Sequence, residues 1–129
     1  MPKAKPLISI VDDDESMREA VKGLMKSLGY RVEAAACAEE FLRSAHVRRT
    51  SCLIADVQMP GMTGLDLYRH LSASGKVIPT VLITAYPDDG VRERALAAGV
   101  IGYLSKPFDE NDLLTCIRSA LTRAGSGGR

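Results

Sequence analysis

The sequence contains little cysteine, almost no net charge and no long hydrophobic run. Its three cysteines, Cys37, Cys52 and Cys116, are odd in number and lack the spacing of metal ligands. They therefore indicate a reducing compartment and no cysteine chemistry. The formal net charge is +1, from 17 basic and 16 acidic residues. This balance provides no broad basic surface for nucleic acid, so any function that uses charge must rest on a local cluster.

The N-terminal segment lacks the pattern of a targeting or membrane-spanning sequence. Residues 1–6, MPKAKP, are basic, but only five largely apolar residues follow before an acidic run. Such a run is too short for a signal peptide or a membrane span. We therefore expect an N-terminal tail at 1–6, a cytoplasmic location and no membrane partner.

Length and composition predict one domain. A chain of 129 residues with 46% hydrophobic residues can fill one core. We expect this domain to span residues 7–122. Residues 123–129, RAGSGGR, have the composition of a flexible tail or of the start of a linker.

Short apolar runs alternate along the chain with segments of helical periodicity. The apolar runs are typical of buried strands, and the run at 31–34 is the weakest because it only alternates. Glycines and acidic residues at the segment ends are typical of helix caps. Strands are expected at 7–11, 31–34, 53–55, 79–84 and 100–104. Helices are expected from apolar positions within 17–28, 38–45, 65–71, 91–98 and 113–121, with 46–51 as a polar connector.

Strands that are each followed by a helix predict a doubly wound α/β fold, (βα)5. Near-continuous apolar runs imply a five-stranded parallel sheet with helices on both faces, as in flavodoxin-like proteins. Right-handed crossovers leave few topologies, and the strand order 2-1-3-4-5 suits five strands. This order reverses between the first and third strands, and ligands are expected there at the carboxyl ends.

The stretch LIADVQMPGMTG at 53–64 ends a predicted strand on an aspartate, Asp56. A carboxylate inside a strand would cost free energy, whereas one at the strand end lies at the rim of the sheet, where ligands bind. Alternatively, Asp56 could cap the helix that begins near Gly64, but the intervening proline and glycine residues place it too far away. The other polar residues expected at this rim are Asp12 and Asp13 after the first strand, Thr84 at the end of the fourth and Lys106 after the fifth.

This set of residues predicts a metal-assisted reaction. Three carboxylates at one rim repel by roughly 4 kcal/mol per close pair at an effective dielectric constant near 20, so the site needs cations. Oxygen donors favour Mg²⁺ over Zn²⁺, which would require His or Cys. Lys106 would add a fixed positive charge. A metal, an ammonium, a hydroxyl and a carboxylate nucleophile together suit phosphoryl transfer, with Asp56 forming an aspartyl phosphate.

Four motifs in order along the chain resemble the receiver domain of a bacterial two-component response regulator. They are IVDDDESMR at the first strand, LIADVQMPGMTGLDL at the third, VLITAY at the fourth and YLSKPF after the fifth. The resemblance covers residues 7–122, nearly the whole chain, and one such motif alone would be weak. It implies Mg²⁺-dependent transfer of a phosphoryl group from a partner sensor histidine kinase to Asp56.

The resemblance also implies a set of metal ligands. Asp13, Asp56 and the backbone carbonyl of Gln58 would hold Mg²⁺, and Asp12 would support the ion through water. Three consecutive aspartates leave the register open. We choose Asp12 and Asp13 because the residue before them should be the last buried residue of the first strand, which makes Asp14 the expected helix cap.

Three further residues receive roles from the resemblance. Lys106 would pair with the phosphoryl group, the Thr84 hydroxyl would bond it after modification, and Tyr103 would be the aromatic switch. The bond between Lys106 and Pro107 is expected to be cis. Structural alternatives are a solvated surface lysine, a threonine chosen for its β propensity and a tyrosine that only fills the core.

Phosphorylation is expected to change the surface formed by the fourth helix, the fifth strand and the fifth helix. That surface would control a homodimer or an effector domain. The phrases FLRSA and IPTVLITAY look most like receivers that precede a helix-turn-helix DNA-binding domain. A role in transcription, with DNA contact only through such a domain, is therefore expected. The chain would catalyse its own phosphorylation and dephosphorylation without turning over a separate substrate, so we do not expect an enzyme.

Other classes of function match parts of the pattern. A phosphatase of the haloacid-dehalogenase type also uses a strand-end aspartate, but it requires a second carboxylate where this chain has Gln58. A flavodoxin-like FMN-binding module requires a phosphate-cradling loop where this chain has DDDE. A degenerate receiver would bind partners without phosphorylation, yet every expected site residue is present. His46 and His70 are expected to have neither partner nor role.

Overall fold

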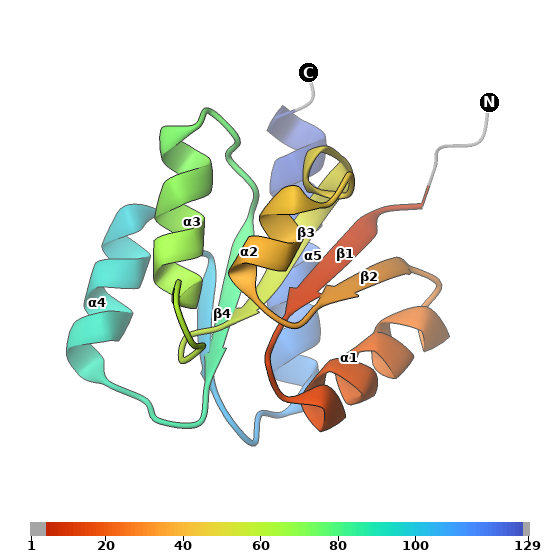
Figure 1. Cartoon of the computed structure of the whole chain (residues 1–129). Helices are drawn as coiled ribbons and strands as arrows, with labels where there is room; N and C mark the ends of the chain where they lie inside the picture. The colour runs from red at the N-terminus through yellow and green to blue at the C-terminus, as the bar shows by residue number, and fades with distance from the viewer. Residues whose placement is uncertain (1–4, 128–129) are drawn as a thin grey trace.

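The computed structural model of the chain describes residues 5–127, with side chains up to residue 122. Most of the tail predicted at 1–6 and the end of the tail predicted at 123–129 lie outside the described residues. The described part forms a five-stranded parallel sheet in the order β2-β1-β3-β4-β5 (Figure 1). Helices cover both faces, and the predicted doubly wound, flavodoxin-like fold is confirmed.

Strands and helices alternate along the chain as the periodicity predicts. The strands are β1 (Leu7–Val11), β2 (Arg31–Ala35), β3 (Thr50–Asp56), β4 (Thr80–Thr84) and β5 (Gly102–Ser105). The helices are α1 (Glu15–Ser27), α2 (Ala38–Arg43), α3 (Gly64–Ala73), α4 (Asp89–Ala98) and α5 (Glu110–Gly127), with a short 3-10 helix, η1, at Val47–Arg49. Within the described part of the chain, no helix has both the length and the apolar character needed to cross a membrane.

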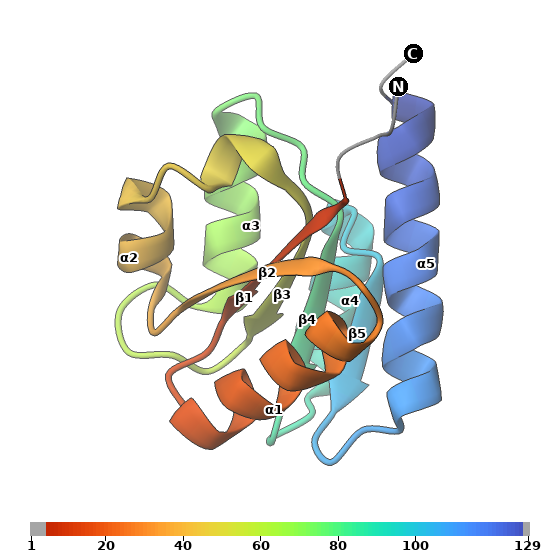
Figure 2. The ribbon, with the colours of Figure 1, turned by 90° about the vertical axis from the view of Figure 1, so that its right-hand side faces the viewer.

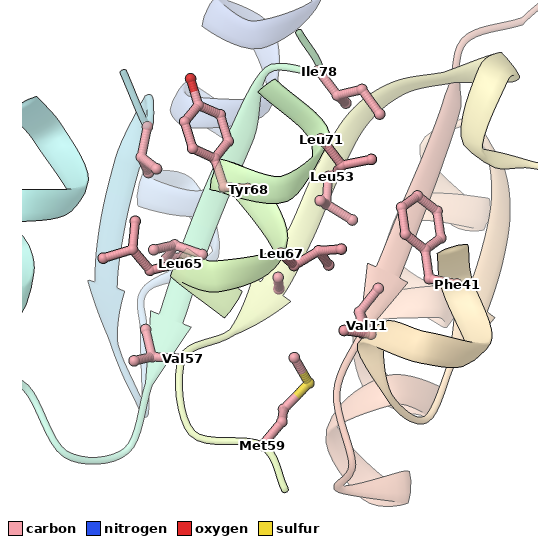
Figure 3. Packing of buried hydrophobic residues seen from close by; sticks show 14 of the residues in the cluster. Val11, Phe41, Leu53, Val57, Met59, Leu65, Leu67, Tyr68, Leu71 and Ile78 are labelled. Atoms are coloured by element: carbon pink, nitrogen blue, oxygen red, sulfur yellow. The ribbon is translucent and has the colours of Figure 1, made fainter. Parts of the chain in front are cut away.

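The sheet divides the core into two clusters. On β3, Leu53 and Ala55 face the side covered by α2, α3 and α4, whereas Cys52 and Ile54 face α1 and α5. Figure 2 shows the sheet between these two layers. In Figure 3 the side chains of α3, among them Leu67, lie over the first face. Because β1, β3 and β4 are covered on both faces, their sequences are apolar almost throughout.

Some element boundaries differ from the predicted ones. β3 begins at Thr50 rather than at residue 53, because the Thr50 hydroxyl finds a buried partner in the Ser9 hydroxyl at 2.6 Å. α5 continues to Gly127, past the predicted boundary at 122, because no proline interrupts the helical hydrogen bonds. The prediction that His46 has no partner is wrong, since its Nε2 lies 3.4 Å from Glu33 Oε1.

The start of α3 is packed tightly behind the end of β3. Thr63 and Asp66 cap the helix reciprocally, each side chain accepting a hydrogen bond from the backbone N–H of the other. A Cβ atom at Gly64 would overlap the carbonyl oxygen of Asp56 and approach Leu82 Cδ2 to 3.0 Å. Glycine at this position therefore allows the helix to begin directly behind Asp56.

We expect Gly64→Ala to lower the free energy of unfolding by about 1–3 kcal/mol, because an overlap with backbone cannot be relieved by rotating a side chain. Gly23→Ala is the matched control. Gly23 lies within α1, where an added Cβ would meet no atom within 4 Å, so alanine should raise stability by about 0.5–1 kcal/mol. Urea unfolding measures both. Equal effects of the two substitutions would contradict the close approach at Gly64.

Candidate functional site

The residues that the sequence predicts for the site lie at or just after the carboxyl ends of β1, β3, β4 and β5, and Figure 1 shows where these strands end. Asp56 is the last residue of β3, and Thr84 is the last residue of β4. Asp12 directly follows β1, and Lys106 directly follows β5. At this edge the Lys106 N–H donates to the carbonyl oxygen of Thr84 at 2.7 Å. Parallel pairing thus brings together residues that are far apart in the sequence.

The Lys106 ammonium links two buried carboxylates. Its Nζ lies 3.1 Å from Asp12 Oδ2 and 3.5 Å from Asp56 Oδ2. Asp12 has no exposed surface, and Asp56 is only 6% exposed, so both carboxylates need a compensating charge. The side chain of Lys106 is 14% exposed, which excludes the alternative of a solvated surface lysine. The Lys106–Pro107 peptide bond is cis, as the resemblance implies.

Hydrogen bonds hold Asp12 through its main chain and its side chain. Its N–H donates to the Ala35 carbonyl at 3.1 Å, and its Oδ1 accepts from the Asp14 N–H at 2.9 Å. Its carbonyl oxygen accepts from Arg18 Nη1 at 2.8 Å. Asp14 in turn caps α1 with its side chain, so the predicted cap is confirmed. Sequence reasoning overlooked Arg18, although its position four residues after the cap places it one helical turn above the loop.

Asp12, Asp13 and Asp56 form a candidate cation site. Their ligand oxygens lie within 4.8 Å of one another, and no other group of three His, Cys, Asp or Glu residues is placed in this way among residues 5–122. The donors are oxygen atoms only, and the exposed Asp13 leaves the site open to water. Gln58, in the loop that follows β3, donates its N–H to Asp56 Oδ1 at 3.3 Å and adds a carbonyl oxygen nearby. This donor set fits Mg²⁺ better than Zn²⁺.

The positive charge near Asp56 does not fully compensate its burial and its repulsion from Asp12. Burial and the charge of Asp12 raise the pKa of Asp56 from 3.8 to about 6, against the opposing effects of Lys106 and of the Gln58 N–H. Burial alone would lower the pKa of Lys106, but its hydrogen bonds with Asp12 and Asp56 and their charges outweigh burial and raise it. Lys106 therefore stays charged, whereas ionised Asp56 remains incompletely neutralised.

The hydroxyl of Thr84 is already engaged in a hydrogen bond. It donates to Gln58 Oε1 and accepts from the Tyr86 N–H at 3.0 Å, and Thr84 has no exposed surface. Gln58 thus links Asp56 and Thr84, its N–H bonding the first residue and its side chain the second. Sequence reasoning predicted a metal contact through the Gln58 carbonyl but did not predict the contact of its side chain with Thr84. The side-chain contact depends on a rotamer, which no sequence pattern specifies.

Tyr103 connects β5 to the start of α4. Its hydroxyl oxygen accepts from the Asp88 N–H at 3.1 Å, and Asp88 caps α4 by accepting from the Val91 N–H at 3.0 Å. The side chain is half-buried and packs against the cluster beneath α3 and α4. Tyr103 is therefore more than core filling, because its polar end holds a helix cap. Its role as a switch stays a prediction.

Comparison with known proteins identifies several relatives. Residues 8–118 match the family model described as a response regulator receiver domain. The chain is 41% identical over 124 residues to the response regulator protein TmoT of Ectopseudomonas mendocina, covering 96% of this chain and 56% of TmoT. It is 32% identical over 129 residues to the transcriptional regulatory protein FixJ of Azorhizobium caulinodans, covering 100% of this chain and 61% of FixJ. The chain thus spans little more than half the length of these curated relatives.

A solved structure agrees with these relatives. The structure of response regulator StyR matches with a TM-score of 0.88 and 41% sequence identity, covering 95% of this chain and 62% of the StyR chain.

We expect Asp56→Asn to stabilise the protein in the absence of divalent cations. A carboxyl group that binds its proton more tightly in the folded state stabilises the protein at low pH. This contribution to the free energy of unfolding is lost as the pH rises from 3.8 towards about 6. At about pH 7 the neutral amide should raise the free energy of unfolding by about 1–2 kcal/mol, less than the full pKa shift implies because solvent screens the open site. Urea unfolding with a chelator, repeated across that pH range, measures the effect.

Glu93→Gln is the control for this prediction. It removes the same charge from an exposed position of α4 and should change stability by less than about 0.5 kcal/mol. A loss of stability in Asp56→Asn, or equal effects of the two variants at every pH, would contradict the electrostatic account of the site.

Proposed function

Because the chain belongs to the response regulator receiver family, we propose that it is a phosphoacceptor switch of a two-component system, in which Asp56 accepts a phosphoryl group from a sensor histidine kinase. The observation that carries this proposal is the placement of Asp56. It ends β3 with its Oδ2 3.5 Å from the Lys106 ammonium. Its carboxylate also shares a cluster, within 4.8 Å, with those of Asp12 and Asp13.

In the proposed reaction a carboxylate oxygen of Asp56 attacks the phosphorus of a phosphohistidine on the kinase. A P–O bond forms while the P–N bond breaks, and the imidazole leaves with the electron pair of that bond and takes a proton from water. With a pKa of about 6, Asp56 is mostly ionised at neutral pH and can act as the nucleophile. The product is an aspartyl phosphate.

The remaining site residues would neutralise the added charge. Asp13, Asp56 and the Gln58 carbonyl, with Asp12 acting through water, would hold Mg²⁺, which offsets charge on the phosphoryl oxygens when bound. Lys106 would pair with another of these oxygens, because its ammonium already lies beside Asp56. Water would later hydrolyse the aspartyl phosphate in the same site. The chain would therefore act on itself and turn over no separate substrate.

The signal would reach the surface through Thr84. In the unmodified protein its hydroxyl donates to Gln58, and a phosphoryl oxygen on Asp56 would offer a stronger, charged acceptor. Movement of Thr84 would change the space beside Tyr103, whose hydroxyl holds the cap of α4. To move the equilibrium from 1:99 to 99:1, phosphorylation must favour the active state by roughly 5.5 kcal/mol. The surface of α4, β5 and α5 would then differ between the two states.

The altered surface would control a homodimer or an effector domain. The relative FixJ is named as a transcriptional regulatory protein, and this chain covers 61% of it, which supports a role in transcription. DNA would be contacted only through a DNA-binding domain outside this chain, because no broad basic surface follows from a net charge of +1. A kinase partner of this kind would place the chain in the cytoplasm.

We expect incubation with acetyl phosphate and Mg²⁺ to add one phosphoryl group, about 80 Da, to the protein. Asp56→Asn should show no adduct, because an amide is not a competent nucleophile, and omission of Mg²⁺ should suppress the adduct in wild type. Intact-protein mass spectrometry measures this. Asp89→Asn, at an exposed position of α4, is the control and should be modified like wild type.

Two outcomes would contradict the phosphoacceptor proposal. The first is an adduct of the same mass on Asp56→Asn, which would place the modification elsewhere. The second is neither an adduct nor release of free phosphate from wild type with Mg²⁺, which would exclude phosphoryl chemistry in this site.

We expect Thr84→Ala to weaken the conformational response to phosphorylation without preventing the phosphorylation of Asp56. Asp56 should still be phosphorylated, but the ratio of active to inactive molecules should fall about tenfold, because one charge-assisted hydrogen bond of about 1.5 kcal/mol is lost. NMR spectra of ring-labelled tyrosine, recorded with and without acetyl phosphate, report on the surroundings of Tyr103. Thr84→Ser keeps the hydroxyl and should respond like wild type. An unchanged response in Thr84→Ala would exclude Thr84 as the coupling residue.

A further inference from the structure

The loop that carries Asp12 and Asp13 is held by one arginine side chain from α1. Arg18 Nη1 donates to the Asp12 carbonyl at 2.8 Å, and the Arg18 N–H donates to the Asp14 carbonyl at 3.0 Å. Arg18 is half-buried, so these contacts are partly protected from solvent. The side chain of Arg18 thus bonds the start of the acidic loop, whereas its main-chain N–H bonds Asp14 as part of α1. Its position on the helix is in turn fixed by the buried α1 residues Val21 and Met25.

The contact of Arg18 is with the main chain and not with a carboxylate. In the described part of the chain, no carboxylate oxygen lies within 4.0 Å of the Arg18 guanidinium. Its principal effect is therefore on where the loop lies. Asp12 has other restraints on its N–H and side chain, but its carbonyl and the following peptide unit, which leads to Asp13, are directed by Arg18.

We propose that Arg18 is a positioning residue for the cation site: by fixing the loop of Asp12 and Asp13, it sets the affinity of the unmodified protein for Mg²⁺. The inference rests on the proposed function for the identity of the cation. Groups that orient ligands without touching the ion commonly change metal affinity about 10–100-fold when removed. The planar guanidinium suits this role, because it is always charged and presents several donors in a fixed arrangement.

The positive charge of Arg18 and its hold on the loop should change Mg²⁺ affinity in opposite directions. Removing a positive charge beside an acidic cluster should, by electrostatics alone, strengthen the binding of a divalent cation. Releasing the loop should weaken it, because the ligands must then be ordered when the ion binds. The direction of the change in Mg²⁺ affinity therefore distinguishes the two roles.

The test is a Mg²⁺ titration of the unmodified chain, followed by the backbone amide NMR signals of the acidic loop. Arg18→Met keeps an aliphatic stem without a donor and should bind Mg²⁺ about tenfold more weakly than wild type. Arg18→Lys can donate one bond to the carbonyl and should recover part of that loss. In acetyl phosphate reactions, the Mg²⁺ concentration that gives half the maximal rate should rise by the same factor. The rate at saturating Mg²⁺ should change by less than about twofold.

Lys22→Met is the matched control. It removes the same charge from the same helix, from a side chain that forms no ion pair with any carboxylate in the described residues, and should bind Mg²⁺ at least as tightly as wild type. Binding by Arg18→Met that equals or exceeds that of wild type would overturn the positioning role.

Two further outcomes are also decisive. If Arg18→Met does not fold by circular dichroism, Arg18→Lys decides: weaker binding than wild type supports the positioning role, and equal binding overturns it. If wild type itself binds no Mg²⁺, the proposed function fails, and that failure is distinct from a failure of the role of Arg18 alone.

Discussion

The ammonium of Lys106 between the carboxylates of Asp12 and Asp56 is the interaction on which this edge of the sheet depends. Two carboxylates roughly 4 Å apart repel by about 4 kcal/mol at an effective dielectric constant of 20, and burial adds a desolvation cost. One ammonium offsets part of this energy and leaves a deficit, which the raised pKa of Asp56 reflects. Stability is therefore lowered at the place where a bound cation would restore it, and cation binding would then be linked to folding.

The charged side chains lie at one edge of the sheet because the fold buries the rest of these strands. Helices cover both faces of β1, β3 and β4, so the side chains within those strands are almost all buried. Polar groups can then be solvated only where a strand ends. Parallel pairing aligns the ends of four strands, and the tight start of α3 at Gly64 packs the backbone directly behind Asp56. The strand order thus brings the polar residues to one edge, and contacts between a few side chains set their positions.

Much of the fold and of the membership of the site could be predicted from the sequence, because continuous apolar runs, glycine caps and strand-end charges are local signals. Strand order alone places four of the site residues together, so they could be predicted: Asp12, Asp56, Thr84 and Lys106. The Arg18 contact with a carbonyl and the Gln58 contact with Thr84 were not, because each depends on a side-chain rotamer. Similarly, the start of β3 depends on the distant partner of Thr50, Ser9, and composition alone did not reveal that α5 continues to Gly127.

The hydrogen bond from Thr84 to Gln58 limits the number of states that the Thr84 side chain can adopt. A hydroxyl carries a single hydrogen, so at any moment Thr84 can donate to only one acceptor. The amide oxygen of Gln58 and any rival oxygen on Asp56 are therefore mutually exclusive destinations for that hydrogen. If Asp56 is phosphorylated as proposed, each molecule would hold Thr84 in one of two hydrogen-bonded states. A graded response would then come from the fraction of molecules in each state.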